Sequence, residues 1–267
     1  MTQTAFLEIQ NLSCGYDKKV VQKDISFIVE KGEILTIIGP NGSGKTTLLK
    51  TIPSLVKSIS GKVLLAGRKI DTMPLLERAS QIAMVMQAAE SVYMTVEEYV
   101  LLGRLPYFKT YQFFEDKKDL DAALKYMEFT NILHLRKSPL SQISSGERQL
   151  ATIAKALVQE PALLLMDEPT SHLDISHQAQ ILKQVVKMKN LYGLTVLMVQ
   201  HDLNLASEYS DKVVLLDKKS KTLFRYGTPG EVITRENIKE VYHTDVVVET
   251  NPHSKRPCVF IRKDYTD

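Results

Sequence analysis

Apolar residues alternate with polar ones in the first third of the chain. In ISFIVE, Ile25, Phe27 and Val29 are separated by single residues, which predicts a half-buried strand. FLEIQNL and KVLLAGRKI have a similar pattern, and the glycines near them are predicted to mark turns: Gly15, Gly32, Gly61 and Gly67.

Other apolar runs are continuous. ILTII, LLLMD and TVLMVQ lack polar alternation, as is typical of central strands that are covered on both faces. LLLMD and TVLMVQ each follow a helical segment, and VVLLD is a further candidate strand. The pattern therefore predicts an α/β core.

Strand signals disappear in the middle of the chain. Thr95 and Glu98 have the spacing of a capping box, and DLDAALKYMEFTNIL has apolar residues at helical spacing. We therefore expect a helical subdomain over about 88–145, inserted into the α/β core. The aromatic segment YFKTYQFF is either a membrane-facing patch or ordinary packing within this subdomain.

Composition limits the possible functions. The formal charge of +3 on 267 residues is too small to favour nucleic acid as a partner. Cys14 and Cys258 have no paired spacing, so a disulfide framework or zinc site is not expected and a reducing compartment fits. The N-terminal residues lack a secretory pattern. Apolar runs reach about five residues where a membrane span needs about 20, so another chain must cross any membrane involved.

GPNGSGKTT follows the run ILTII and precedes a helical pattern. Glycines let the backbone turn so that its amides face an anion, and a helix beginning near Lys45 adds its positive end. Lys45 can reach the β- and γ-phosphates, and the Thr46 hydroxyl can bind Mg²⁺. The candidate phosphate-binding residues are Gly39, Pro40, Asn41, Gly42, Ser43, Gly44, Lys45, Thr46 and Thr47.

Polar residues follow three other apolar runs. Asp167 ends LLLMD, where a carboxylate can hold Mg²⁺, and Glu168 is predicted on the other side of an extended backbone, where it can accept a proton from water. His201 follows TVLMVQ and Gln87 follows IAMVM. Ligands bind at the carboxyl ends of such strands, so His201 is expected near a γ-phosphate and Gln87 near the metal or the water.

The segment ISSGERQ has two interpretations. Ser144 and Glu147 form a capping box, which is a structural explanation, whereas a helix N-terminus with serine and glycine is also an anion site. Together with the segments above, ISSGERQ resembles the signature motif of the ATP-binding cassette (ABC) ATPases. The resemblance extends over nearly the whole chain.

The resemblance assigns roles to these residues. It implies that Tyr16 stacks on adenine, that GPNGSGKT is the Walker A motif and that Gln87 is the Q-loop glutamine. Asp167 and Glu168 match the Walker B pair, SHLD at 171–174 matches the D-loop with Asp174, and His201 matches the switch histidine. The implied fold is a P-loop NTPase core with a mainly parallel sheet and flanking helices, plus an N-terminal antiparallel β subdomain and the helical insertion.

The family also implies a shared site. Two copies pair head to tail and hold two ATP molecules, each with Mg²⁺, between the Walker A motif of one copy and the signature of the other. The signature residues are Ser144, Ser145, Gly146 and Glu147. Glu168 is then the general base, and His201 holds the γ-phosphate and the water.

The signature departs from the usual LSGGQ. Ser145 replaces a glycine, Glu147 replaces a glutamine, and Leu150 stands where an arginine is frequent. None of these changes removes the phosphate loop, the metal ligands or the base. We therefore expect ATPase activity with altered nucleotide affinity.

Finer segments resemble the ATPases of importers for iron–siderophore complexes, heme and cobalamin. They are MTVEEYVLLGRLPY, DEPTSHLDISHQ and the tail EVYHTDVVVETNPHSKRPCVFI, which is expected to add a short strand pair over about 240–267. The resemblance implies one ABC ATPase domain over 1–267, acting at the inner face of the cell membrane. Its partners would be a second copy, a separate permease and, indirectly, an extracytoplasmic substrate-binding protein.

Several alternatives stay open at this point. Importers of zinc, manganese and molybdate share parts of these segments. A small-molecule kinase would need no membrane partner, but the signature and His201 speak against it. A DNA-associated ABC ATPase would need a basic face, for which the net charge gives little support.

Overall fold

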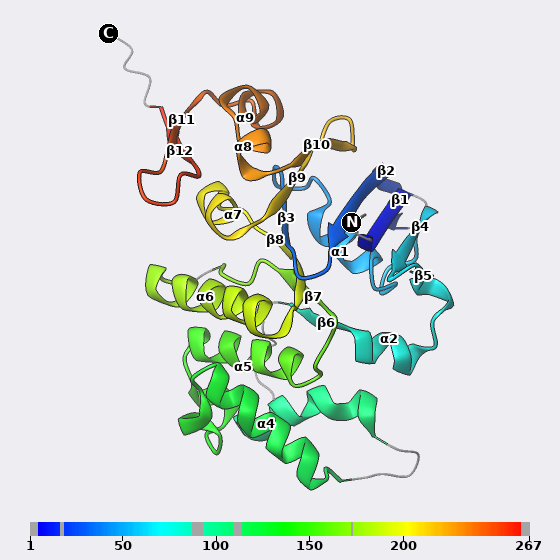
Figure 1. Ribbon diagram of the computed structural model, residues 1–267, viewed down its shortest axis with the longest axis vertical. Coiled ribbons are helices and arrows are strands. Elements are labelled where there is room, and N and C mark those ends of the chain that lie inside the picture. Colours follow the sequence, from blue (N-terminus) through cyan, green and yellow to red (C-terminus); the bar gives the residue numbers. More distant parts are fainter. Residues whose placement is uncertain (1–4, 17–18, 87–92, 109–113, 172, 263–267) are drawn as a thin grey trace. The chain divides into compact units, whose positions relative to one another are not determined.

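The computed structural model describes residues 5–16, 19–86, 93–108, 114–171 and 173–262 (Figure 1). The chain divides into two compact units. One contains residues 1–72 and 197–267, and the other contains residues 73–196.

The first unit begins with a four-stranded antiparallel sheet in the order β2-β1-β4-β5. Its strands are β1 (Ala5–Tyr16), β2 (Lys19–Glu30), β4 (Ser60–Leu65) and β5 (Arg68–Lys69). Ile25, Phe27 and Val29 on β2 are buried, and Ser26 and Ile28 between them are exposed. The alternating pattern of ISFIVE thus corresponds to one buried face of this sheet.

Two of the four predicted turn glycines lie inside strands instead. Gly32 and Gly67 are in turns, but Gly15 belongs to β1 and Gly61 to β4. At Gly61 the backbone has φ +82°, and a Cβ atom would collide with the backbone of Asn11 on the neighbouring strand. The turn prediction is wrong at these two positions because close approach of adjacent strands, rather than chain reversal, requires glycine there.

The strands of a second sheet that belong to the first unit have the order β10-β9-β3-β8. Its strands are β3 (Ile34–Ile38), β8 (Thr195–Val199), which begins at the boundary of the unit, β9 (Lys212–Leu216) and β10 (Leu223–Gly227). β3 pairs in parallel with β9, and β10 is antiparallel to β9. The continuous runs ILTII and TVLMV are buried at every position, as predicted for central strands.

Helices of the first unit supply the core around these strands. They are α1 (Lys45–Thr51), the short 3-10 helix η1 (Ile70–Thr72), α7 (Leu203–Tyr209), α8 (Pro229–Val232) and α9 (Arg235–Tyr242). Ile38 and Leu215 of the sheet pack with Ala206 of α7, Val232 of α8 and Val241 of α9. These apolar contacts hold α7, and with it the segment that contains His201, against the sheet.

The tail forms the predicted strand pair. β11 (Val246–Thr250) and β12 (Pro257–Ile261) are antiparallel, with Val248 opposite Val259. Val259 also packs against the core cluster of the first unit.

The second unit is mainly helical. Its elements are α2 (Leu75–Gln81), β6 (Ile82–Val85), α3 (Val96–Leu101), η2 (Leu102–Tyr107), α4 (Lys117–Phe129), η3 (Leu133–Leu135), η4 (Leu140–Gln142), α5 (Ser145–Leu157), β7 (Leu163–Asp167) and α6 (Ile175–Tyr192). β6 and β7 are parallel. The regular elements in the described part of 88–145 are helical, as predicted, and α3 begins with the capping box of Thr95 and Glu98.

A half-buried arginine joins the helices of this region. The Arg104 guanidinium lies 2.9 Å from the Asp119 carboxylate of α4, donates to the backbone oxygen of Val158 and stacks over the Tyr107 ring. Tyr107 also donates to the backbone oxygen of Gln159. Tyr107 thus contacts the unit through its ring and hydroxyl while its side chain is 41% exposed, and Phe114 at the other end of the segment is 81% exposed. Residues 109–113 of that segment lie outside the described residues.

Candidate nucleotide site

The segment GPNGSGKTT connects β3 to α1 in the first unit. Gly44 precedes α1 with φ +85°, and a Cβ atom there would lie 2.5 Å from a methyl group of Val21. Gly39 has φ +152°, and its Cβ would lie 2.7 Å from the backbone oxygen of Leu216. Both positions need glycine because the backbone is left-handed and neighbouring strands press on it.

Lys45 is almost completely buried in this loop. Its ammonium group donates to the backbone oxygens of Gly39 at 2.8 Å and Pro40 at 3.2 Å. The loop thus carries a positive charge next to its own backbone. A phosphate chain is the ligand whose charge suits that position.

Ser43 offers a second test of fit. Its side chain is 1% exposed, and its hydroxyl has no hydrogen-bond partner among the described residues. A buried hydroxyl without a partner is costly, and a phosphate oxygen could accept its hydrogen bond. The residues present therefore fit the phosphates of a nucleotide.

The other loop residues lie as follows. Asn41 and Gly42 are exposed, Pro40 is half-buried, and Thr46 and Thr47 are the second and third residues of α1, with Thr47 buried. Tyr16, at the end of β1, is 49% exposed.

Gln22 is a residue of this site that sequence reasoning missed. It is fully buried on β2, and its amide donates to the backbone oxygens of Ser43 and Asp217. Gln22 thus ties the phosphate loop to the antiparallel sheet and to the end of β9. The signal in the sequence that could have found Gln22 is weak: a polar residue occupies a position of the strand that is expected to face inward, and a buried polar side chain needs a hydrogen-bond partner.

His201 reaches the same edge of the sheet as the phosphate loop. The backbone amide of Gln200 donates to the oxygen of Ile37, which is two residues before Gly39. His201 follows and is exposed, and the Asp202 side chain then caps α7 by accepting from the amides of Asn204 and Leu205. The structure therefore brings His201 and the phosphate loop to one edge, as the strand pattern predicts.

Asp167 and Glu168 belong to the second unit. Asp167 is the last residue of β7, as predicted. Glu168 has φ +49° instead of an extended backbone, and its carbonyl oxygen accepts hydrogen bonds from the amide and the hydroxyl of Ser171. The prediction of an extended backbone at Glu168 is wrong, because a turn closed by Ser171 redirects the chain. A left-handed non-glycine residue is strained, and such residues cluster at functional sites.

The signature segment is the N-terminus of α5. Ser144 is the N-cap; its hydroxyl accepts from the Glu147 amide, and the Glu147 carboxylate accepts from the Ser144 amide at 2.8 Å and its hydroxyl at 2.7 Å. These hydrogen bonds, the hydroxyl first, hold the pKa of Glu147 below its usual range. The capping box is confirmed. Ser144 and Ser145 are exposed, whereas Gly146 is buried.

Asp174 is the N-cap of α6. Its carboxylate accepts from the Ser176 hydroxyl at 2.6 Å and from the backbone and ring nitrogens of His177. These bonds, that of Ser176 first, lower the pKa of Asp174 well below its usual range. Gln87, and His172 in the D-loop segment, lie outside the described residues.

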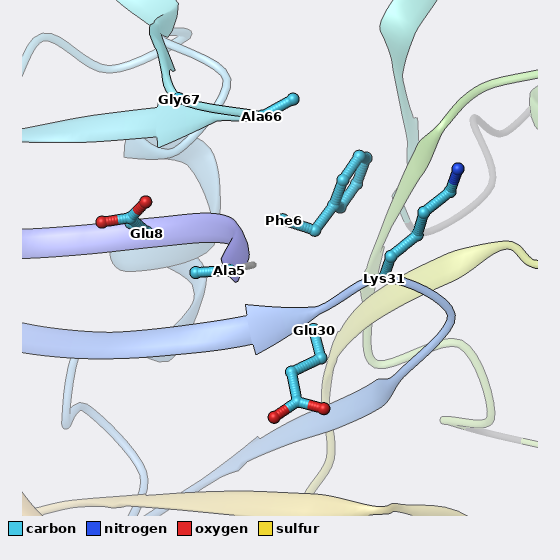
Figure 2. A pocket seen from close by; sticks show the side chains of 7 residues that line it. All are labelled: Ala5, Phe6, Glu8, Glu30, Lys31, Ala66 and Gly67. Carbon is cyan, nitrogen blue, oxygen red and sulfur yellow. The ribbon is translucent and has the colours of Figure 1, made fainter. Parts of the chain in front are cut away.

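A separate pocket of about 570 Å³ opens at one end of the antiparallel sheet, where β1 begins and β2 ends (Figure 2). It is lined by Ala5, Phe6, Glu8, Glu30, Lys31, Ala66 and Gly67. The Glu30 carboxylate also pairs with Lys212 at 3.4 Å. None of these lining residues belongs to the candidate nucleotide set.

A phosphate loop at the end of a parallel strand, acids at the end of another and a capped signature helix define a class of nucleotide-binding ATPases. The family model of the ABC transporters matches residues 22–171, more than half of the chain. The chain belongs to the ABC transporter family. It is an ATP-binding ATPase subunit with the α/β cassette fold expected from the sequence.

Individual relatives cover almost the whole chain. The iron(3+)-hydroxamate import ATP-binding protein of Bacillus subtilis (strain 168) is 37% identical over 254 residues, 94% of this chain and 93% of the relative. The ferric enterobactin transport ATP-binding protein of Escherichia coli (strain K12) is 35% identical over 261 residues, 97% and 95% of the two chains.

Solved structures agree in fold. A metal-chelate type ABC transporter in an inward-facing conformation has a TM-score of 0.83 and 27% identity over 97% of both chains. An ATP-binding cassette in a dimeric post-hydrolysis state with ADP and phosphate has a TM-score of 0.72 and 26% identity over 83% of this chain and 98% of its own. Among the described residues of the present chain, no helix is both long and apolar enough to span a membrane.

Proposed function

We propose that this chain uses ATP to drive uptake of an iron–siderophore complex or a related metal chelate through a separate permease. The observation that carries the proposal is the similarity, over more than nine-tenths of the chain, to ATPases named for hydroxamate and enterobactin import. The similarity in fold to a metal-chelate type transporter supports it as well.

The nucleotide is held first by the chain's own phosphate loop. When ATP binds, the Lys45 ammonium group gives up its hydrogen bonds to the backbone oxygens of Gly39 and Pro40 and contacts the β- and γ-phosphates instead. The Ser43 hydroxyl donates a hydrogen bond to a phosphate oxygen. Tyr16, exposed at the end of β1, stacks on adenine. The loop therefore holds the ammonium group of Lys45 and the hydroxyl of Ser43 near their binding positions before ATP arrives, which lowers the entropy cost of binding.

Thr46, Asp167 and Gln87 would hold Mg²⁺, because their oxygens are the ligands that this ion prefers. When bound, the ion supplies positive charge to the phosphates during transfer. Thr46 lies in the first turn of α1 and Asp167 at the end of β7.

A second copy of the chain completes each site. The exposed Ser144 and Ser145 and the backbone of Gly146 and Glu147 face the phosphates held by the partner copy, with Asp174 beside them. The capping box supports this role because its hydrogen bonds join Ser144 and Glu147 and leave the side chain of Ser145 exposed. The dimeric state of a related cassette with ADP and phosphate also supports it.

In hydrolysis, Glu168 accepts a proton from the attacking water while the bond between the β–γ bridging oxygen and the γ-phosphorus breaks, giving ADP and phosphate. The left-handed backbone of Glu168 supports this role, since strained residues other than glycine cluster at active sites. His201, at the carboxyl end of β8, holds the γ-phosphate and the water.

The remaining partners follow from the transporter class. The helical subdomain of about 88–145 contacts the permease at the inner face of the cell membrane, and an extracytoplasmic binding protein delivers the chelate to that permease. The segment of about 240–267 is a short extension of a single ATPase domain. No step of this cycle involves nucleic acid.

Replacing Glu168 by glutamine tests the chemical part of the proposal. This change should lower ATP turnover by about 10² to 10⁴ while MgATP still binds, because the carboxamide cannot take the proton. The exposed Lys183→Ala on α6 is the matched control and should keep full turnover. A Glu168→Gln variant that hydrolyses ATP at the wild-type rate would remove Glu168 as the base.

Reconstitution tests the cargo. The chain, its co-purified permease and the binding protein are placed in proteoliposomes, with ATP supplied on the side of the ATPase. ATP-driven uptake of a ⁵⁵Fe-labelled hydroxamate or catecholate chelate supports the proposal. Uptake of free zinc, manganese or molybdate instead would make the chain the ATPase of a metal-ion or oxyanion importer.

A further inference from the structure

The imidazole of His177 lies between two segments of the candidate nucleotide site. Its ring nitrogen Nδ1 is 3.0 and 2.9 Å from the two carboxylate oxygens of Asp174, and its backbone amide donates to the same carboxylate at 2.9 Å. Because an ionised carboxylate only accepts hydrogen bonds, Nδ1 carries the proton. The ring is thereby held in one orientation in the first turn of α6.

The other edge of the ring lies against Gly146 of the signature. A Cβ atom added to Gly146 would lie 2.5 Å from Cδ2 and 2.8 Å from Nε2 of His177, which is closer than side chains approach one another. The ring therefore occupies the space that any other residue at position 146 would fill. This contact explains why Gly146 is buried although Ser144 and Ser145 next to it are exposed.

The same ring lies close to the unusual acid of the signature. Glu147 stands where the family has glutamine, and its carboxylate is turned back onto Ser144 by two hydrogen bonds. The imidazoles of His134 and His177 are near enough to contribute to the lowered pKa of Glu147.

We propose that His177 is a positioning residue that links Asp174 to the signature backbone at Gly146. Through this link, the two segments predicted to face the partner's nucleotide keep a fixed distance when two copies close on ATP. This inference rests on the proposed function, in which the signature and Asp174 act across a dimer. His177 itself acts through the backbone of Gly146 and touches no reacting atom.

ATP-driven dimerisation is the measurement that tests this role. If His177 only stabilised the fold, its removal would lower the melting temperature and leave dimerisation unchanged. In the hydrolysis-deficient Glu168→Gln background, adding His177→Ala should raise the ATP concentration needed for dimer formation about tenfold, measured by sedimentation velocity. ATP affinity of the dilute monomer and the melting temperature should change little. The control Lys183→Ala lies on the same helix and should match the background.

A double-mutant cycle tests the contact itself. Gly146→Ala should impair dimerisation strongly, because the new methyl group meets the ring, and the same change should cost less when His177→Ala has removed the ring. The inference is overturned if His177→Ala leaves the dimerisation midpoint unchanged, if it lowers monomer ATP affinity and melting temperature in parallel, or if the two substitutions act independently. If Glu168→Gln alone never dimerises with ATP, the proposed function has failed instead.

Discussion

At the scale of single residues, the candidate site depends on backbone conformations that few side chains tolerate. Gly44 is left-handed at the start of α1, and Glu168 is left-handed without being glycine. Glycine accepts such a conformation freely, whereas for glutamate it costs of order 1–3 kcal/mol. The phosphate loop therefore needs its glycines for shape, and the strain at Glu168 must be supported by the turn that Ser171 closes.

Replacing Gly44 by alanine should weaken both folding and ATP binding. The new Cβ would lie 2.5 Å from Val21, so β2 and the loop must separate, and we expect a loss of about 1–3 kcal/mol in the free energy of unfolding. Urea denaturation and ATP titration by calorimetry measure the two effects.

Gly193→Ala is the matched control for this change. Gly193 is also left-handed, at φ +64°, but no atom lies within 4 Å of its added Cβ. It should cost stability alone and leave ATP affinity unchanged. Equal losses of affinity in both variants would contradict the steric explanation.

The capping box at the signature should make stability depend on pH. The folded pKa of Glu147 is lowered, so the ionised form stabilises the fold above the ordinary pKa near 4.5, and this contribution disappears as pH falls through the lowered value. Ser144→Ala removes the cap and should cost about 1 kcal/mol at pH 7.

The difference in unfolding free energy between wild type and Ser144→Ala should therefore shrink below about pH 4, as measured by urea denaturation across the range. Thr95→Ala, which removes the equivalent cap of α3, is the control for general capping. It should show a similar pH trend without affecting ATP-driven dimerisation. A difference that grows on acidification would contradict the direction of the Glu147 shift.

At the scale of elements, the tail supports the helix that follows His201. α7 has seven residues, which is too short for a helix to be stable alone. The Asn204 side chain exchanges hydrogen bonds with both backbone groups of Val259, and the Arg256 guanidinium donates to the backbone oxygens of Ser207 and Ser210 at the end of α7. β12 and the residue before it, Arg256, thus supply hydrogen-bond partners that this short helix lacks.

Arg256→Ala should loosen α7. The carbonyl groups at its end lose a charged donor, which should lower the free energy of local opening by about 1 kcal/mol. Backbone amides over 203–209 should therefore exchange with deuterium several-fold faster. Hydrogen-exchange mass spectrometry measures this. The control is His253→Ala, an exposed position in the same hairpin loop, and it should leave the exchange of α7 unchanged. If Arg256→Ala speeds exchange in β11 and β12 but not in α7, the arginine supports the tail and not the helix.

At the scale of the whole molecule, the proposed sites are shared between two copies, and mixing damaged chains can test this. Lys45→Ala disables the phosphate loop and a Gly146→Ala change disables the signature, so each homodimer should be inactive. In a mixed dimer, one site combines the changed phosphate loop of one chain with the changed signature of the other. The second site combines the two unchanged segments, so ATP turnover should reappear on mixing.

Mixing Lys45→Ala with Glu168→Gln provides the control for sharing. Both residues act from the same chain on the same nucleotide, so each site of that mixed dimer carries one lesion and turnover should stay absent. Recovery in this control, or none in the first mixture, would contradict head-to-tail sharing. Phosphate release at equal total chain concentration is the measurement.

Much of this protein could be predicted from the sequence, because the informative signals are local. The continuous runs became β3, β7, β8 and β9, and the capping boxes at Thr95 and Ser144 begin α3 and α5. The two partners of a capping box are three residues apart, and a continuous apolar run marks a covered strand within about five residues, so both signals can be read from a short stretch of sequence.

Contacts between distant segments were decided by the tertiary structure alone. Gln22 reaches the loop at Ser43, the Glu168 backbone turns left-handed, Gly61 admits a neighbouring strand, and His177 lies against Gly146. The sequence by itself determined the family, the phosphate loop and the order of the elements. Which side chains hold these segments in place depends on packing between residues far apart in the chain, and spacing along the chain carries no record of that packing.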